Sequence, residues 1–283
     1  MNNLDALIFI DTNILLDFYR IRSSDVKLSY LDLIDKNHQR IIVGSQVEME
    51  YKKNRQRVIL DSIGQIKTPN WNSLSPPALL QNSQPIKIIR DCKKEIKKQQ
   101  IKLRDRIINI LQEPGSNDIV YQTLQRLFKT TSKWNLNRNN KIRFSIRNLA
   151  KKRFILGYPP RKKDDNSIGD AINWEWIINC AEKSKKHIII VTRDSDFGAT
   201  YNNQLFLNDY LLQEFKERIS NRRKIVLTDK LSQAFKMIDL AVTKEMEDAE
   251  NELILNNLKK KRNNEQEFEK FLEEFKHIRN EDK

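Results

Sequence analysis

The chain has 283 residues, 39% of them hydrophobic and 32% charged, which is typical of a globular protein with a sizeable core. Its net charge of +14 favours an anionic partner, with nucleic acid the leading candidate over a basic surface kept for solubility. Two cysteines are too few for a disulfide framework or a zinc site, and three scattered histidines do not support a Ser/His/Asp triad. The lack of a signal peptide or membrane span predicts a cytoplasmic protein.

Short apolar runs predict four buried strands, at residues 6–10, 41–43, 188–191 and 225–227. Continuous apolar runs indicate strands that are covered on both faces, as in a parallel sheet. Helical patterns separate the strands, at about residues 26–36, 46–65, 168–182, 208–219 and 230–242. This alternation predicts a doubly wound α/β domain with a mainly parallel sheet over residues 1–243.

Two regions stand outside this alternation. We predict a basic helical insertion at about residues 61–155, and a charged helical extension at residues 244–283 whose apolar stripe docks on the core or pairs with a partner. Residues 119–163 contain thirteen Lys and Arg and no Asp or Glu, and this segregation favours a nucleic-acid-binding surface over an ordinary solvated face. The basic residues assigned to that surface are Arg143, Arg147, Lys151, Lys152, Arg153, Arg161, Lys162 and Lys163.

Five carboxylates follow predicted strands or begin predicted helices. Asp11 directly follows the first strand, and Asp194 and Asp196 follow the third. Glu48 lies in the first turn of the helix after the second strand, and Asp170 opens a later helix. Because the carboxyl ends of parallel strands share one edge of the sheet, we expect these groups to lie together.

Each acid also has a purely structural explanation. Asp11 with Asn13 fits an Asx turn, and Ser45 with Glu48 has the spacing of a capping box. The acids after the third strand fit a solvated loop. The five positions together are harder to explain in this way than any one of them alone.

Asp170 carries the strongest chemical argument. It shares a helical stripe with Trp174, Ile177 and Ala181, so its carboxylate is expected to point toward the sheet. Converging carboxylates repel one another unless a cation neutralises them. All-oxygen ligands suit Mg²⁺ or Mn²⁺, and such ions support hydrolysis of phosphodiester bonds.

The same segments resemble the motifs of the PIN domain family. Residues 9–16 (FIDTNILL) resemble its opening motif, 45–48 (SQVE) its second acidic site, 167–171 (SIGDA) its third and 191–197 (VTRDSDF) its fourth. Residues 158–163 (YPPRKK) are similar to the larger bacterial PIN-like branch, whose domains carry a helical insert. The resemblance covers residues 4 to about 242, apart from the insertion.

The resemblance implies an endoribonuclease that uses Mg²⁺ or Mn²⁺. The implied catalytic acids are Asp11, Glu48, Asp170 and Asp194. The implied metal ligands are Asp11, Asp170, Asp194 and, as an auxiliary, Asp196. The implied supporting residues are Thr12, Asn13, Ser45 and Thr192. Glu48, which would orient or deprotonate the attacking water, is preferred over Glu50 because it falls in the first helical turn, and a helix aims the two about 200° apart.

Other functions stay open at this point. A nucleic-acid-binding module without turnover and a structure-specific DNA nuclease both fit the basic charge and the acidic pocket. A phosphatase of the haloacid-dehalogenase type requires Asp-x-Asp after the first strand, and Asn13 stands in the second place. The family includes toxins of toxin–antitoxin pairs and nucleases of phage defence, so a regulated nuclease with a homodimeric or protein partner is a further expectation.

Overall fold

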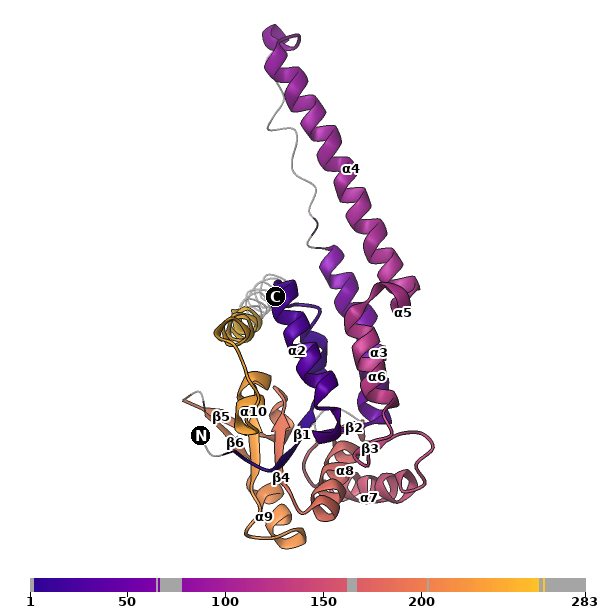
Figure 1. Ribbon diagram of the computed structural model, residues 1–283, viewed down its shortest axis with the longest axis vertical. Coiled ribbons are helices and arrows are strands. Elements are labelled where there is room, and N and C mark those ends of the chain that lie inside the picture. The colour runs from indigo at the N-terminus through magenta and orange to yellow at the C-terminus, as the bar shows by residue number, and fades with distance from the viewer. Residues whose placement is uncertain are drawn as a thin grey trace, which may run out of the picture.

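The computed structural model describes residues 3–64, 66, 78–161, 167–202, 204–259 and 262. Its centre is a five-stranded, all-parallel sheet with the order β3-β2-β1-β4-β7 (Figure 1). These strands are β1 (Ala6–Ile10), β2 (Ile41–Gly44), β3 (Asn135–Leu136), β4 (His187–Val191) and β7 (Ile225–Thr228). The doubly wound α/β fold predicted from the alternating pattern is confirmed.

The three central strands are buried because their apolar residues are continuous rather than alternating. Every residue of β1 and β2 is buried, as are the last four of β4. Ile8 lies between Ile41 of β2 and Ile189 of β4 in the register of the sheet. Side chains on both faces of these strands therefore lie in the core.

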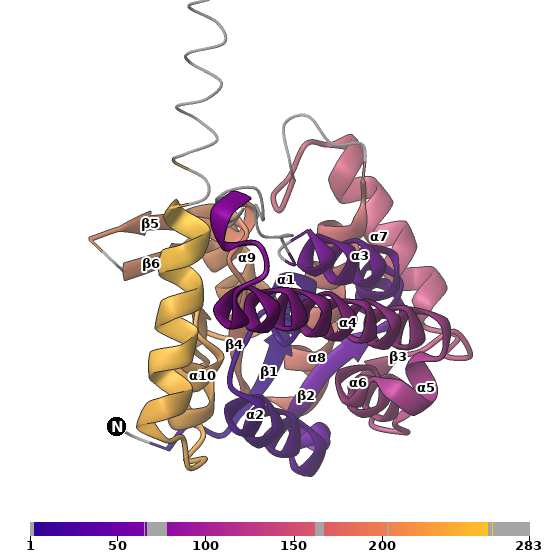
Figure 2. The same ribbon diagram turned by 90° about the horizontal axis from the view of Figure 1, so that it is seen from above.

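Helices cover the sheet on both sides (Figure 2). The helices of the α/β domain are α1 (Thr12–Asp17), α2 (Ser24–Lys36), α3 (Ser45–Ile63), α6 (Ile119–Lys129), α7 (Arg143–Ile155), α8 (Gly169–Ser184), α9 (Asp209–Arg218) and α10 (Leu231–Met237), of which α7 packs on α8. Crossovers between parallel strands are right-handed, so connections running toward β3 and those running toward β7 place their helices on opposite faces. Tyr30 of α2 packs against Phe235 of α10, with ring centroids 6.3 Å apart, so these two helices share a face.

The predicted insertion at residues 61–155 is corrected in its second half. The β3 strand joins the main sheet, and α6 buries Val120, Leu124 and Leu127 in the common core. The part that stands outside the core is the long α4 (Gln84–Gln112) with the short α5 (Pro114–Asn117). Figure 1 shows α4 projecting away from the sheet, and none of its residues, all of which are described, is buried.

A small antiparallel hairpin follows β4 and was not predicted. It consists of β5 (Gly198–Tyr201) and β6 (Gln204–Leu207), directly after the 3₁₀ turn η4 (Ser195–Phe197). Two further 3₁₀ turns are η1 (His38–Arg40) and η3 (Ala78–Leu80). The hairpin places a short second sheet beside β7, at the end of the acidic loop.

The C-terminal extension begins with a helix at residues 244–259. This helix packs against the core through Met246, which is buried, and through the partly buried Ala249 and Leu253. The apolar stripe expected at residues 268–278 lies outside the described residues. In the described part of the chain, every helix is too short or too polar to cross a bilayer.

Candidate metal centre

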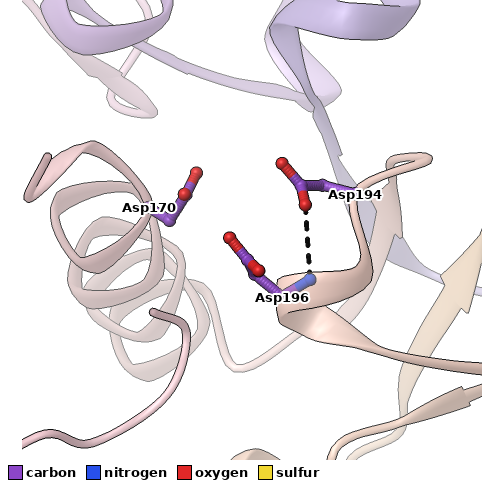
Figure 3. A group of neighbouring side chains, drawn as sticks. All are labelled: Asp170, Asp194 and Asp196. Atoms are coloured by element: carbon purple, nitrogen blue, oxygen red, sulfur yellow. Dashed lines mark hydrogen bonds between the residues drawn. The ribbon is translucent and has the colours of Figure 1, made fainter. Parts of the chain in front are cut away.

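Three carboxylates converge at the carboxyl edge of the sheet. Asp170 comes from the first turn of α8, Asp194 from the loop after β4, and Asp196 from η4. Each offers an oxygen that lies within 4.8 Å of an oxygen of the other two. Figure 3 shows the Asp170 and Asp196 side chains facing across the gap between α8 and the loop, with Asp194 beside them. The backbone N–H of Asp196 donates a 3.4 Å hydrogen bond to the side-chain oxygen Oδ1 of Asp194, which holds the two loop acids in one turn.

Asp11 directly follows β1 and is linked through Thr192 to Asp194. Its carboxylate is buried and accepts hydrogen bonds from Thr12 N (2.6 Å), Asn13 Nδ2 (2.7 Å) and Thr192 Oγ1. Burial raises the pKa of Asp11 to about 6, the hydrogen bonds from Thr192 and Thr12 counteract part of that rise, and the negative charges of Glu50 and Asp194 add to it. The shift is therefore mainly an effect of burial, with a smaller contribution from the neighbouring carboxylates.

Thr192 joins Asp11 to the loop acids. Its hydroxyl donates to the Asp11 carboxylate and accepts from Asp194 N (3.0 Å). The Thr192 side chain therefore holds Asp11 and the backbone of Asp194 in a fixed relative position. Asn13 donates to Thr192 Oγ1 (3.2 Å) and accepts from Arg193 N at 3.4 Å. The structure thus brings Thr12, Asn13 and Thr192 next to Asp11, where supporting residues were expected.

The two candidates for the second acid, Glu48 and Glu50, have different partners in the structure. The Glu48 carboxylate accepts a 2.6 Å hydrogen bond from Lys52, one turn further along α3. Glu50 instead accepts from Thr12 Oγ1 (3.1 Å), directly beside Asp11, and from Gln46 Nε2 (2.6 Å). Because residues two apart on a helix point about 200° from each other, only one of the two glutamates can face the site. That one is Glu50.

Sequence reasoning missed the way α3 and α8 meet. A Cβ at Gly169 would collide with Glu50 Oε1 and lie 2.7 Å from Gln46 Nε2, so glycine at this position leaves room for the ends of these two side chains. The close approach brings Glu50 to the start of α8, next to Asp170. A sequence signal did exist, because Lys52 stands four residues after Glu48 and offers that glutamate a partner on its own helix face.

The capping-box explanation of Glu48 is not realised. Gly44, not Ser45, is the N-cap of α3, and glycine has no side chain with which to close the box. Ser45 is the first residue of α3 and is half-buried. At α8 the N-cap is Ile168, while Ser167 Oγ accepts from Gly169 N at 3.3 Å.

The predicted nucleic-acid-binding residues differ in their exposure. Arg147, Lys151, Lys152 and Arg161 are exposed, and Arg143 is half-buried with its guanidinium 4.7 Å from the Phe144 ring centroid. Lys162 and Lys163 lie outside the described residues. The Arg161 guanidinium stands 4.7 Å from the ring centroid of Phe154.

Arg153 is the clear exception, and its assignment to the nucleic-acid-binding surface is wrong. It is buried, and its guanidinium pairs with Glu175 (2.9 Å) and Glu214 and donates to Pro159 O (2.6 Å). Both carboxylates are themselves largely buried, so the arginine neutralises charges inside the fold. Arg153 therefore ties α7 to α8 and α9.

Comparison with families supports what the geometry indicates. A family model described as a PIN domain matches residues 8–197, which is more than half of the chain and contains the acids considered for the site, Asp11, Glu48, Glu50, Asp170, Asp194 and Asp196. Searches of curated proteins and of solved structures gave no match. PIN domains are generally metal-dependent nucleases, and the acidic cluster of Figure 3 lies within the matched segment. With five parallel strands, a shared acidic edge and this match, the chain belongs to the PIN domain family.

Proposed function

We propose that this protein is a divalent-metal-dependent endoribonuclease. The observation that carries the proposal is the meeting of Asp170, Asp194 and Asp196 within 4.8 Å, beside the buried Asp11. These residues come from three separate stretches of the chain. Like charges so close together repel one another, and a bound divalent cation would offset that repulsion.

The donor set fits Mg²⁺ or Mn²⁺. All of the candidate ligands are carboxylate oxygens, which hard divalent cations prefer, and the described residues of the cluster include no His or Cys. Asp170, Asp194, Asp196 and Asp11 would hold the metal. When bound, the metal would lower the pKa of water and stabilise the negative charge that develops on a phosphodiester during hydrolysis.

The protein's own residues would orient the reaction. We assign to Glu50, in place of Glu48, the task of orienting or deprotonating the attacking water, since its carboxylate lies beside Thr12 and Gly169. Thr192 and Asn13 keep the Asp11 carboxylate in one orientation through their hydrogen bonds. Preorganised groups of this kind need no rearrangement at the moment of reaction.

RNA is the proposed substrate. The net charge of +14 supports a nucleic acid, and the exposed Lys151, Lys152 and Arg161 supply phosphate contacts without reading sequence. The preference for RNA over DNA rests on the resemblance to PIN-like branches that act mostly on RNA. A role as a toxin or in phage defence, and a protein or homodimer partner, stay predictions from the same resemblance.

The test compares labelled single-stranded RNA, single-stranded DNA and duplex DNA with Mg²⁺, Mn²⁺ or EDTA. We expect internal cleavage of RNA that requires the metal, and we expect Asp170→Asn to reduce it about 100-fold or more, because a bound metal contributes several kcal/mol to such reactions. Asp32→Asn is the matched control, since Asp32 is exposed on α2 and pairs with Lys36. Cleavage of DNA alone would overturn the RNA proposal, and no cleavage with either metal would overturn the nuclease proposal.

A further inference from the structure

Arg193 lies between two residues of the site but its side chain points elsewhere. Thr192 and Asp194 flank it, and the backbone at Asp194 is extended, with φ −81° and ψ 134°. In an extended segment neighbouring side chains point to opposite sides. The guanidinium of Arg193 accordingly pairs with Asp17, at the end of α1, and Nη2 lies 3.9 Å from Glu250 Oε1.

Glu250 belongs to the C-terminal helix at residues 244–259, outside the segment that matches the family model. It is 5% exposed. Its Oε1 accepts from Leu231 N (2.6 Å), and its Oε2 accepts from Ser232 N (3.0 Å), from the Ser232 hydroxyl and from the Tyr30 hydroxyl (3.3 Å). Glu250 therefore caps the first turn of α10 with a carboxylate, because the preceding Lys230 side chain has no acceptor to offer.

The surroundings of Arg193 make this contact electrostatically important. The Arg193 side chain is only 18% exposed, so its guanidinium is largely removed from water and lies next to the carboxylates of Asp17 and Glu250. A buried guanidinium is tolerated only where carboxylates compensate it. Asp17 is shared with Arg20, whose Nη1 lies 2.8 Å from Asp17 Oδ1, so Glu250 is the second carboxylate on which Arg193 depends.

We propose that Glu250 is a positioning residue for the metal centre. By holding Arg193 on the far side of the loop, it fixes the direction in which Thr192 and Asp194 face the cluster. The C-terminal helix is then part of the active unit, although the family match ends at residue 197. This inference rests on the proposed metal-dependent function and names the element that supports it.

The test uses the full-length chain and two matched variants. Glu250→Gln removes the charge next to Arg193, and Glu252→Gln makes the same change two residues on, where the side chain is 57% exposed beside Arg22. Mn²⁺ affinity is measured by electron paramagnetic resonance without any substrate, and hydrogen exchange of residues 192–198 reports on the loop. We expect Glu250→Gln to weaken Mn²⁺ binding about tenfold, as loss of a supporting partner does, and to speed exchange in the loop, with Glu252→Gln unchanged.

A purely structural cap would give a different result. If Glu250→Gln lowers the melting temperature but leaves Mn²⁺ affinity and loop exchange as in the wild type, the proposal is overturned. If that variant does not fold, Arg193→Lys tests the same contact, because it keeps the charge and loses the planar fork. Failure of the nuclease proposal is seen separately as absent cleavage by the wild type, since neither metal binding nor exchange needs a substrate.

Discussion

Glu48 and Glu50 show how two identical side chains on one helix acquire different roles. Glu48 is paired with Lys52, which is 41% exposed, in an arrangement common on solvated helix faces. Glu50 is held by Thr12 and Gln46 at the point where α3 approaches Gly169 of α8. Chemical identity does not separate them, but the position of the neighbouring helix does.

The two glutamates can be distinguished by substitution. We expect Glu50→Gln to reduce the rate of RNA cleavage about 100-fold, the usual effect of losing a general base, with the binding of RNA little changed. Glu48→Gln should change the rate less than about twofold, because an exposed helical ion pair contributes little. Single-turnover cleavage measures the rate and filter binding measures affinity. A loss of rate in Glu48→Gln instead of Glu50→Gln would contradict the assignment.

The acids themselves were predictable, whereas the choice between the two glutamates had only one weak signal in the sequence, the Lys52 partner on the same helix face as Glu48. Asp11, Asp170 and Asp194 follow strands or begin helices, and that position alone places them at the carboxyl edge of the sheet. Which side of α3 faces α8 depends on packing between helices more than a hundred residues apart in sequence. Periodicity within one helix carries no information about that contact.

At the scale of elements, α7 combines surface charge with a buried ion pair. Lys151 and Lys152 are exposed, whereas the next residue, Arg153, is buried against Glu175 and Glu214. A run of three basic residues on a helix spans about 200° from its first to its last member, so the run necessarily turns from solvent toward the core. Charge composition alone could not reveal this division.

Lys152→Met and Arg153→Met should therefore separate binding from folding. We expect Arg153→Met to lower the free energy of unfolding by about 3 kcal/mol, since it leaves two largely buried carboxylates with one partner fewer. Lys152→Met should change stability by less than about 0.5 kcal/mol, yet weaken RNA binding and reduce its salt dependence by about 0.7 in log–log slope. Urea unfolding and titrations at several salt concentrations measure the two effects. Equal stability of both variants would show that the Arg153 pairs are not structural.

The elements that sequence predicted best are those with long, uniform patterns. Strands β1, β2, β4 and β7 are built on continuous apolar runs, and α2, α3, α8 and α9 were predicted within about two residues of their observed ends. The β3 strand has only two residues and was absorbed into the predicted insertion. Its place in the sheet comes from pairing with Val43 and Gly44, a long-range contact without a local signature.

At the scale of the whole molecule, the proposed metal centre would connect segments that lie far apart in the sequence. Asp11, Asp170 and Asp194 belong to different parts of the sheet edge, so a cation shared by them cross-links β1, α8 and the loop after β4. Anything that binds the folded state only must stabilise it. Stability, metal concentration and pH are therefore linked through Asp11.

The sign of that linkage can be worked out from Asp11. Its pKa is raised from 3.8 to about 6 in the folded protein, so the metal-free chain loses stability as pH rises through this interval, by at most about 3 kcal/mol from this group. A metal needs the deprotonated carboxylate and competes with the proton below about pH 6. We expect saturating Mn²⁺ to raise the melting temperature by about 5 °C or more at pH 7.5 and far less at pH 5.

Differential scanning calorimetry with Mn²⁺ or EDTA at pH 5, 6 and 7.5 measures this effect. Asp11→Asn is the matched variant, because it keeps the shape of the side chain and removes the titrating group. In that variant the stability of the metal-free protein should no longer fall between pH 4 and 6, and the gain from Mn²⁺ should shrink at pH 7.5 because one ligand has lost its charge. An equal gain from Mn²⁺ at pH 5 and pH 7.5 in the wild type would mean that Asp11 does not contribute to holding the metal, and the centre would then consist of Asp170, Asp194 and Asp196 alone.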